Sequence, residues 1–188
     1  MRLFVAVDLS SETRAQLGAV REQIGSLLNG RRAPRITWVK PEVAHLTVQF
    51  LGEVADHDVD QVTGALGGHS LADGPFVVSW DALGAFPDTR RPRVLWLGAA
   101  SGTESMQALA REVRKRLAAV AIVDEDRPFR AHVTVARVRD PGSGVRWSDI
   151  VSRVRPGRTI MQVDHVTLYQ SQLSPHGPRY TALATWTL

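Results

Sequence analysis

The sequence predicts an α/β (α+β) fold of two pseudo-symmetric lobes, each an antiparallel-rich sheet with outer helices, around a central cleft. Strand and helix patterns alternate along the whole chain, without a flexible linker between domains. The order strand, helix, strand, helix, strand occurs twice, over approximately 2–86 and 93–173, and a last strand follows at 179–188. The middle strand of each half carries the same His-x-Thr pattern, at His45 and at His132. We therefore expect residues 1–188 to form one bilobal domain.

The first half begins with a short buried-type strand, "RLFVAVDL" (2–9). Ser10 or Ser11 can cap the helix that follows, in which apolar residues recur at helical spacing. The remaining predicted elements of this half are strands at 36–39 and 45–52, a helix near 57–67 that ends in "GGHS", and a strand at 75–87.

The second half repeats this order. It begins with a strand at 93–100 and a strongly amphipathic helix over 103–121. The predicted elements that follow are a strand at 129–139, a short helix at 145–154, one long strand at 159–173, the turn "SPHGP" and the final strand. Each element of the first half except the strand at 36–39 therefore has a counterpart in this half.

The composition is that of a soluble globular protein, and a cytoplasmic enzyme is the simplest interpretation. The 188 residues include 44% hydrophobic and 22% charged side chains. No apolar run approaches the roughly 20 residues of a membrane span, and the first residues do not form a signal peptide. The absence of cysteine excludes disulfides and thiolate chemistry, and a zinc site would have to use histidines and carboxylates.

The positive charge of the chain is compatible with an anionic partner such as RNA. The formal net charge is +4, and nearly all basic residues are arginines, because only Lys40 and Lys115 are lysines. The planar guanidinium group binds phosphate well. The same composition equally fits a genome that favours arginine codons and a solvated arginine-rich surface, so charge alone leaves the partner open.

Two His-x-Thr strands side by side would place two imidazoles and two hydroxyls in one cavity. Alternate side chains of a strand share a face. His45 and Thr47 therefore point one way, while the alternating residues of that strand, including Phe50, are expected to point into a core. His132 and Thr134 form the matching pair in the second half.

These groups suit the opening of a cyclic phosphodiester, in which water loses a proton while the departing ribose oxygen gains one. Imidazole, with an ordinary pKa of about 6.5, can be the base or the acid near neutral pH. The threonine hydroxyls can donate to phosphate oxygens. A metal site is disfavoured because His-x-His spacing and accompanying carboxylates are missing, and no Gly-x-Ser-x-Gly elbow indicates a serine nucleophile.

A third copy of the pattern, "DHVTLYQS" (164–171), places His165, Thr167 and Tyr169 on one strand face. Alignment of the two halves sets His165 over Val78, so this copy has no partner. We therefore expect His165 to be a structural residue of a strand.

Several segments resemble the two-histidine (2H) phosphoesterases, most closely the RNA 2′,3′-cyclic phosphodiesterases, which are also described as 2′-5′ RNA ligases. They are, in chain order, "RLFVAVDL", "WVKPEVAHLTVQFLGEV", "RRPRVLWLG", "FRAHVTVARV" and "LYQSQLSPHGPRYTAL". One departure is Ala131, where the family has proline, and it removes no catalytic group. The resemblance implies a bilobal fold with a central cleft, no metal or other cofactor, and hydrolysis of a 2′,3′-cyclic phosphate to a 2′-phosphomonoester.

The resemblance also implies roles for the paired motifs. His45 would be the proton donor to the leaving 3′ oxygen, and His132 would be the proton acceptor that activates water. Thr47 and Thr134 would hold the phosphate. Pseudo-equivalent histidines could exchange these roles, and they do so in the reverse reaction.

Three further residues are candidates for substrate binding. Arg137 corresponds to a family arginine that binds phosphate or the RNA backbone, but strict alternation would put it on the face opposite His132. Phe50 and Tyr169 could stack on a base, although aromatic residues in strands are more often part of a core.

The same site is compatible with other substrates, namely a cyclic nucleotide, a 2′-5′ oligonucleotide, an ADP-ribose cyclic phosphate or 2′-5′ RNA ends that are ligated reversibly. A different class is a non-catalytic RNA-end binding module, which would use Arg31, Arg32, Arg35, Arg90, Arg91 and Arg93. A matched acid and base favour the enzyme, because binding alone does not require them. We expect a monomer that acts on RNA with 2′,3′-cyclic phosphate or 2′-5′ linked ends.

Overall fold

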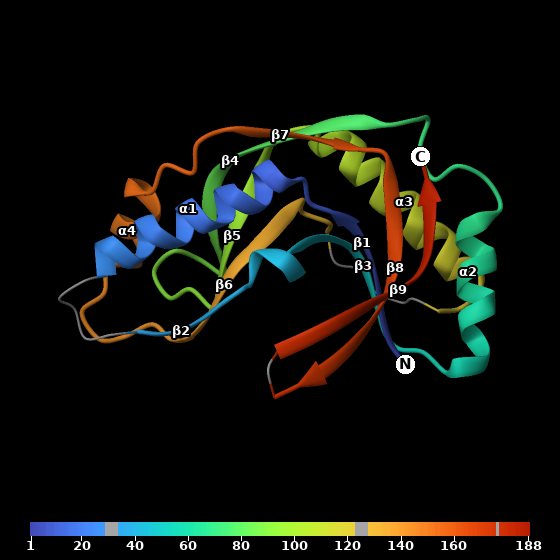
Figure 1. Cartoon of the computed structure of the whole chain (residues 1–188), viewed down its shortest axis with the longest axis horizontal. Helices are drawn as coiled ribbons and strands as arrows, with labels where there is room; N and C mark the ends of the chain where they lie inside the picture. The colour runs from blue at the N-terminus through green and yellow to red at the C-terminus, as the bar shows by residue number, and fades with distance from the viewer. Residues whose placement is uncertain (29–33, 123–127, 176) are drawn as a thin grey trace.

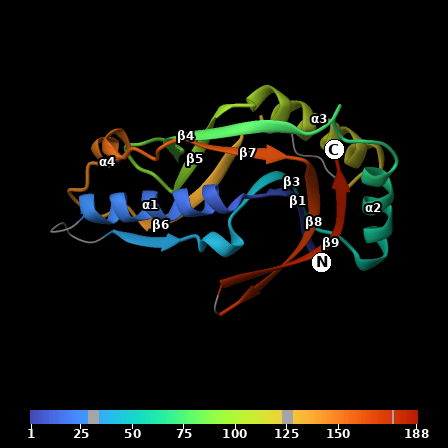
Figure 2. The same cartoon turned by 45° about the horizontal axis from the view of Figure 1, so that its top comes forward.

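Two antiparallel sheets form the centre of the computed structural model, which describes residues 1–28, 34–122, 128–175 and 177–188 (Figures 1 and 2). The first sheet has the strand order β3-β1-β8-β9. Its strands are β1 (Arg2–Asp8), β3 (His45–Glu53), β8 (His165–Ser174) and β9 (Gly177–Thr187). The distal part of the β8–β9 hairpin extends toward the side of the molecule that carries β2 (Figures 1 and 2).

The second sheet has the strand order β2-β6-β5-β4-β7. Its strands are β2 (Arg35–Trp38), β4 (Phe76–Phe86), β5 (Val94–Ser101), β6 (His132–Asp140) and β7 (Thr159–Val163). The two His-x-Thr strands, β3 and β6, therefore belong to different sheets, and each pairs with the central strand that begins its half of the sequence, β1 or β5.

The two long helices, α1 (Ser11–Leu28) and α3 (Thr103–Ala119), pack on the sheet opposite to the strand that precedes them. The other described α-helices are α2 (Val59–Gly67) and α4 (Trp147–Arg153), with short 3-10 turns η1 (Pro41–Val43) and η2 (Asp56–Asp58). Helix α1 follows β1 but contacts β6 and β7, whereas α3 follows β5 but contacts β3 (Figure 1). None of the described helices is long and apolar enough to cross a membrane.

The strands are exchanged in the same way, because β4 lies beside β5 and β8 lies beside β1. The prediction of one strand over 159–173 is therefore wrong. The chain leaves the second sheet after Val163 and enters the first sheet at His165. Asp164 stands at this crossing, and its carbonyl accepts a hydrogen bond from the amide of Leu188 (2.8 Å). Each lobe thus contains strands from both halves of the sequence.

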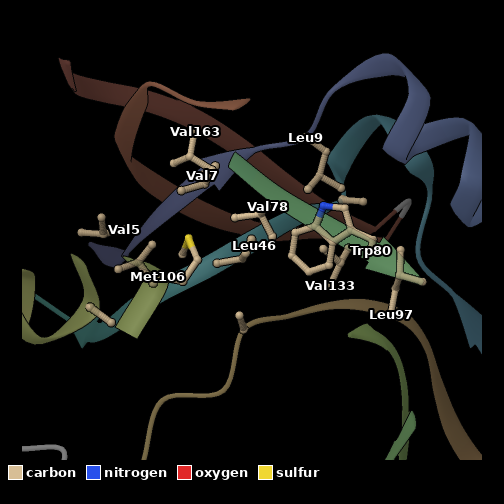
Figure 3. Packing of buried hydrophobic residues seen from close by; sticks show 14 of the residues in the cluster. Val5, Val7, Leu9, Leu46, Val78, Trp80, Leu97, Met106, Val133 and Val163 are labelled. Carbon is tan, nitrogen blue, oxygen red and sulfur yellow. The ribbon is translucent and has the colours of Figure 1, made fainter. Parts of the chain in front are cut away.

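One continuous cluster of buried apolar side chains joins the two sheets (Figure 3). Val5, Val7 and Leu46 come from the first sheet. Leu97 and Val133 come from the second sheet, and all five are at most 2% exposed. Since successive residues of a strand point to opposite faces, the histidines that precede Leu46 and Val133 lie on the face away from this core.

Candidate active site

Both predicted His-Thr pairs line one cleft of about 840 Å³, which is bounded by residues of both sheets. His45 and Thr47 of β3 lie on its first wall, and His132 and Thr134 of β6 lie on its second wall. All four side chains are half-buried. The structure therefore places in one cavity the four groups that the sequence analysis paired.

A bulge in β3 brings Phe50 to the same cleft. The register with β1 shifts after Thr47, and two successive residues, Val48 and Gln49, are buried. This extra residue reverses the alternation of side chains along the strand. Phe50 is therefore 53% exposed and lines the cleft, so the prediction that it points into the core is wrong.

A matching bulge in β6 has the same effect on Arg137. The register with β5 shifts after Thr134, and Val135 and Ala136 are both buried. Arg137 then returns to the face of His132 and lines the cleft together with Arg139. Strict alternation predicted the opposite face for Arg137, and that prediction is wrong because the strand is bulged.

Each catalytic candidate histidine is oriented by the backbone two residues before it. His45 Nδ1 lies 3.0 Å from the Val43 carbonyl oxygen, and His132 Nδ1 lies 2.7 Å from the Arg130 carbonyl oxygen. A carbonyl can only accept, so Nδ1 carries a hydrogen in both rings. Nε2 is then the nitrogen that gains or loses a proton.

The two imidazoles have different electrostatic surroundings. Burial lowers the pKa of His45 below its ordinary value of 6.5, while its bond to the Val43 carbonyl and the charge of Asp8 oppose this shift. Arg14 and Arg137 add to the lowering. The carboxylate of Asp8 therefore favours the protonated form of His45.

Burial also lowers the pKa of His132 below 6.5, and its bond to the Arg130 carbonyl opposes the shift. The guanidinium groups of Arg130 and Arg137 lower the pKa further. Arg130 is held beside this histidine, with its guanidinium carbon 4.5 Å from the ring centroid of Trp96. The charged groups around His132 thus favour its neutral form.

The model of the family described as LigT like Phosphoesterase matches residues 7–96 and again residues 97–180. The chain belongs to this family. The two matches follow one another along the chain, and each includes one of the two His-x-Thr strands.

Relatives and solved structures of LigT-like phosphoesterases cover the chain over nearly its full length. An RNA 2′,3′-cyclic phosphodiesterase of Archaeoglobus fulgidus is 34% identical over 97% of this chain and 98% of its own. The crystal structure of TT0787 of Thermus thermophilus is 30% identical, with a TM-score of 0.75 over 100% of this chain and 98% of its own. Escherichia coli LigT complexed with 3′-AMP is 29% identical, with a TM-score of 0.72 over 100% and 97%.

Aromatic rings surround the two histidines of this LigT-like phosphoesterase. Phe4 lies 4.7 Å from His45 between ring centroids, and Tyr180 meets His45 edge-on at 5.1 Å. Phe86 meets His132 edge-on, also at 5.1 Å. Tyr180 and Phe86 also line the cleft. Neither could be predicted from the sequence, because an aromatic residue in a strand carries no signal of its surroundings.

Tyr169, a predicted stacking residue, is not among the residues that line the cleft. Its ring stacks on Phe4 with centroids 5.5 Å apart, and its hydroxyl donates to Asp8 Oδ1 at 2.7 Å. Burial, followed by this bond to Asp8, raises the pKa of Tyr169 to about 12. Tyr169 is therefore not part of the proposed binding site.

The positive groups of the cleft differ from the arginine surface considered in the sequence analysis. The basic residues that line the cleft are Arg2, Lys40, Arg137 and Arg139. Arg35, Arg90, Arg91 and Arg93 are not among the lining residues, and Arg31 and Arg32 lie outside the described residues. Within the described ranges, no group of three or more His, Asp or Glu side chains is arranged to hold a metal ion.

Proposed function

We propose that this LigT-like phosphoesterase hydrolyses RNA 2′,3′-cyclic phosphodiester ends to 2′-phosphomonoesters by metal-independent acid/base catalysis. The observation that carries the proposal is the lining of one cleft by two histidines and two threonines from matching strands. Both histidines have Nδ1 bound to the backbone, which directs the chemistry to Nε2. The relative from Archaeoglobus fulgidus, an RNA 2′,3′-cyclic phosphodiesterase, supports the choice of reaction.

In the proposed reaction, neutral His132 accepts a proton at Nε2 from the water that attacks phosphorus. Protonated His45 donates its Nε2 proton to the 3′ oxygen as the bond between that oxygen and phosphorus breaks. Thr47 and Thr134 donate hydrogen bonds to the non-bridging oxygens, where charge accumulates. The proton lost by water and the proton gained by the ribose balance, so the two histidines finish with their roles reversed.

The two bulged strands offer different groups to the rest of the substrate. Phe50 and Arg137 each lie five residues after the histidine of their strand and line the cleft. We assign an exposed aromatic ring to stacking on a base and a guanidinium group to the phosphate or the RNA backbone. The crystal structure of Escherichia coli LigT complexed with 3′-AMP supports a nucleotide as a ligand of this protein.

The test is incubation with a short RNA that ends in a 2′,3′-cyclic phosphate, followed by chromatographic identification of the product. We expect the 2′-phosphomonoester and no loss of rate in EDTA. A 3′-phosphomonoester or EDTA-sensitive turnover would contradict the proposed mechanism. Parallel reactions with cyclic nucleotides, 2′-5′ oligonucleotides and ADP-ribose cyclic phosphate would reassign the substrate, and tight salt-sensitive binding without turnover would favour a binding module.

The pH profile of kcat/KM should be a bell with its maximum below pH 6.5. Activity falls when the solution becomes acidic enough to protonate His132, and falls again when it becomes basic enough to deprotonate His45. Burial lowers both pKa values below 6.5, so the midpoint between the two limbs also lies below 6.5. Initial rates measured across pH 4 to 9 at low substrate concentration would check this, and a profile with a single limb would rule out a histidine pair.

Arg137→Met should reduce kcat/KM for an RNA substrate by about tenfold to a hundredfold. The change removes the guanidinium group that contacts the substrate anion in our proposal. The binding free energy that is lost is that of one charge-assisted hydrogen bond. Arg90→Met, at an exposed arginine that is not among the cleft-lining residues, is the matched control. Equal losses in both variants, measured at the same ionic strength, would show a general charge effect instead of a specific contact.

A further inference from the structure

The third His-x-Thr pattern lies on the same sheet face as the first, with only β1 between them. Asp8 of β1 is the direct partner of His45 in β3, and Ala6 is the partner of both Thr47 and Thr167. Continuing this register places His165 on the other side of Asp8, and its Nε2 lies 3.5 Å from Asp8 Oδ2. The side chain of Asp8 therefore lies between two histidines.

Strand β8 fixes the carboxylate of Asp8. The Tyr169 hydroxyl donates to Asp8 Oδ1 at 2.7 Å. The His165 ring is itself held, because its Nδ1 is hydrogen-bonded to the carboxylate of the preceding residue, Asp164. The Thr167 hydroxyl also donates to Asp8 Oδ2, at 3.5 Å. Asp8 is thus contacted by three side chains of β8, on the side away from His45.

The second sheet has no carboxylate at the equivalent position, because the partner of His132 is Gly98. The indole of Trp96 lies flat across this part of the sheet. A Cβ on Gly98 would lie 2.6 Å from that indole, and a Cβ on Gly84 of the adjacent strand would lie 2.2 Å from it. The indole therefore occupies the space that a side chain beside His132 would need.

The charged and titratable groups around His45 come from four elements. Asp8 on β1 faces it directly, Arg14 on α1 and Arg137 on β6 act on it, and Tyr180 on β9 meets its ring edge-on. Asp8 is the negative group in this set. The groups that face Asp8 from the other side are His165 and Tyr169 of β8, with Asp164 behind His165.

We propose that Asp8 is the positioning residue that gives His45 the acid role, and that the third His-x-Thr strand holds Asp8 in place through Tyr169 and His165. The two halves of the site are otherwise alike, because each has a histidine, a threonine two residues later and a bulge after the threonine. Asp8 opposite one histidine and Gly98 opposite the other therefore distinguish the acid from the base. This inference rests on the proposed function for its kinetic consequence, but its electrostatic consequence can be measured without any substrate.

The test is Asp8→Asn, which removes the charge and keeps the shape of the side chain. We expect the pKa of His45, followed by NMR of the histidine ring signals, to fall by about 0.5 to 1 pH unit, and that of His132 to stay unchanged. The alkaline limb of the kcat/KM profile should shift to lower pH by the same amount. Above that limb, kcat/KM should fall by about threefold to tenfold. Asp8→Glu keeps the negative charge, so the pKa of His45 in this variant should stay close to its wild-type value.

Asp164→Asn is the matched control, since Asp164 also contacts His165 but does not face His45. It should leave the pKa of His45 and both limbs in place. An unchanged pKa of His45 in Asp8→Asn, or an equal shift in both variants, would overturn the inference. A shift of the acid limb of the kcat/KM profile in Asp8→Asn would also overturn the inference, because it would make His45 the base. Because the NMR titration needs no turnover, failure of the proposed substrate would leave this test intact.

Discussion

His45→Ala and His132→Ala are each expected to lower kcat for cyclic phosphate hydrolysis by about 10²- to 10⁴-fold, the usual contribution of a positioned general acid or base. Each histidine lines the cleft, and its Nδ1 is hydrogen-bonded to a backbone carbonyl. Neither β3 nor β6 carries a second histidine that could replace it. Single-turnover assays at the optimal pH would measure the loss. They report the chemical step separately from product release.

The fold should survive both substitutions, because the two rings lie on the cleft face and the core residues beside them, Leu46 and Val133, are unchanged. Thermal unfolding would verify this. His165→Ala is the control that shares the sequence pattern, and we expect its turnover to stay within about tenfold of wild type, roughly 1.4 kcal/mol in barrier. A loss in His165→Ala as large as in His132→Ala, or full activity in either cleft variant, would contradict the assignment.

The alternating pattern of the strands predicted the central part of the site from sequence. His45 with Thr47, and His132 with Thr134, were assigned to shared faces because strand geometry has a period of two residues. That period holds in both strands from the histidine to the threonine. Local rules are sufficient for such short distances, and repetition of the pattern in both halves indicated that the two faces would meet.

The period fails beyond the threonine, and single-sequence patterns do not show why. Val48 and Val135 are the residues at which β3 and β6 gain their extra position, but valine is equally common in regular strands. The bulges become visible only through the register with β1 and β5. Phe50 and Arg137 were therefore placed on the wrong face, although both were named as candidates.

The exchange of strands between the lobes was also beyond local reasoning. Nothing in "TIMQVDHVTLYQ" interrupts an extended chain except Asp164, and a single polar residue is compatible with a continuous strand. Which sheet each part joins depends on long-range pairing. The same pairing sets Asp8 opposite His45, and for this reason the role of the third His-x-Thr pattern could not be derived from the sequence.

Thr47→Val and Thr134→Val are each expected to lower kcat by about 10²- to 10³-fold, as when one donor to a developing oxyanion is removed. Valine matches the shape of threonine and favours the strand conformation, so the change removes the hydroxyl and little else. Both threonines line the cleft on the face of their histidine. KM should change less than kcat, because the hydrogen bonds strengthen as charge builds up on the phosphate oxygens.

Thr167→Val tests whether the effect belongs to the cleft or to the pattern. Thr167 sits opposite Ala6 in register with Thr47, but it is only 2% exposed and is not among the residues that line the cleft. Its hydroxyl lies 3.2 Å from that of Thr185 and donates a long bond of 3.5 Å to Asp8, which Tyr169 and His165 also hold. Its turnover should stay within a few fold of wild type. If Thr167→Val lost as much activity as Thr47→Val, the threonines would act through sheet stability and not through the phosphate. Unfolding temperatures that fell together with activity would support an effect on sheet stability. Unchanged unfolding temperatures, with a hundredfold loss only in Thr47→Val and Thr134→Val, would show that these two hydroxyls stabilise the transition state.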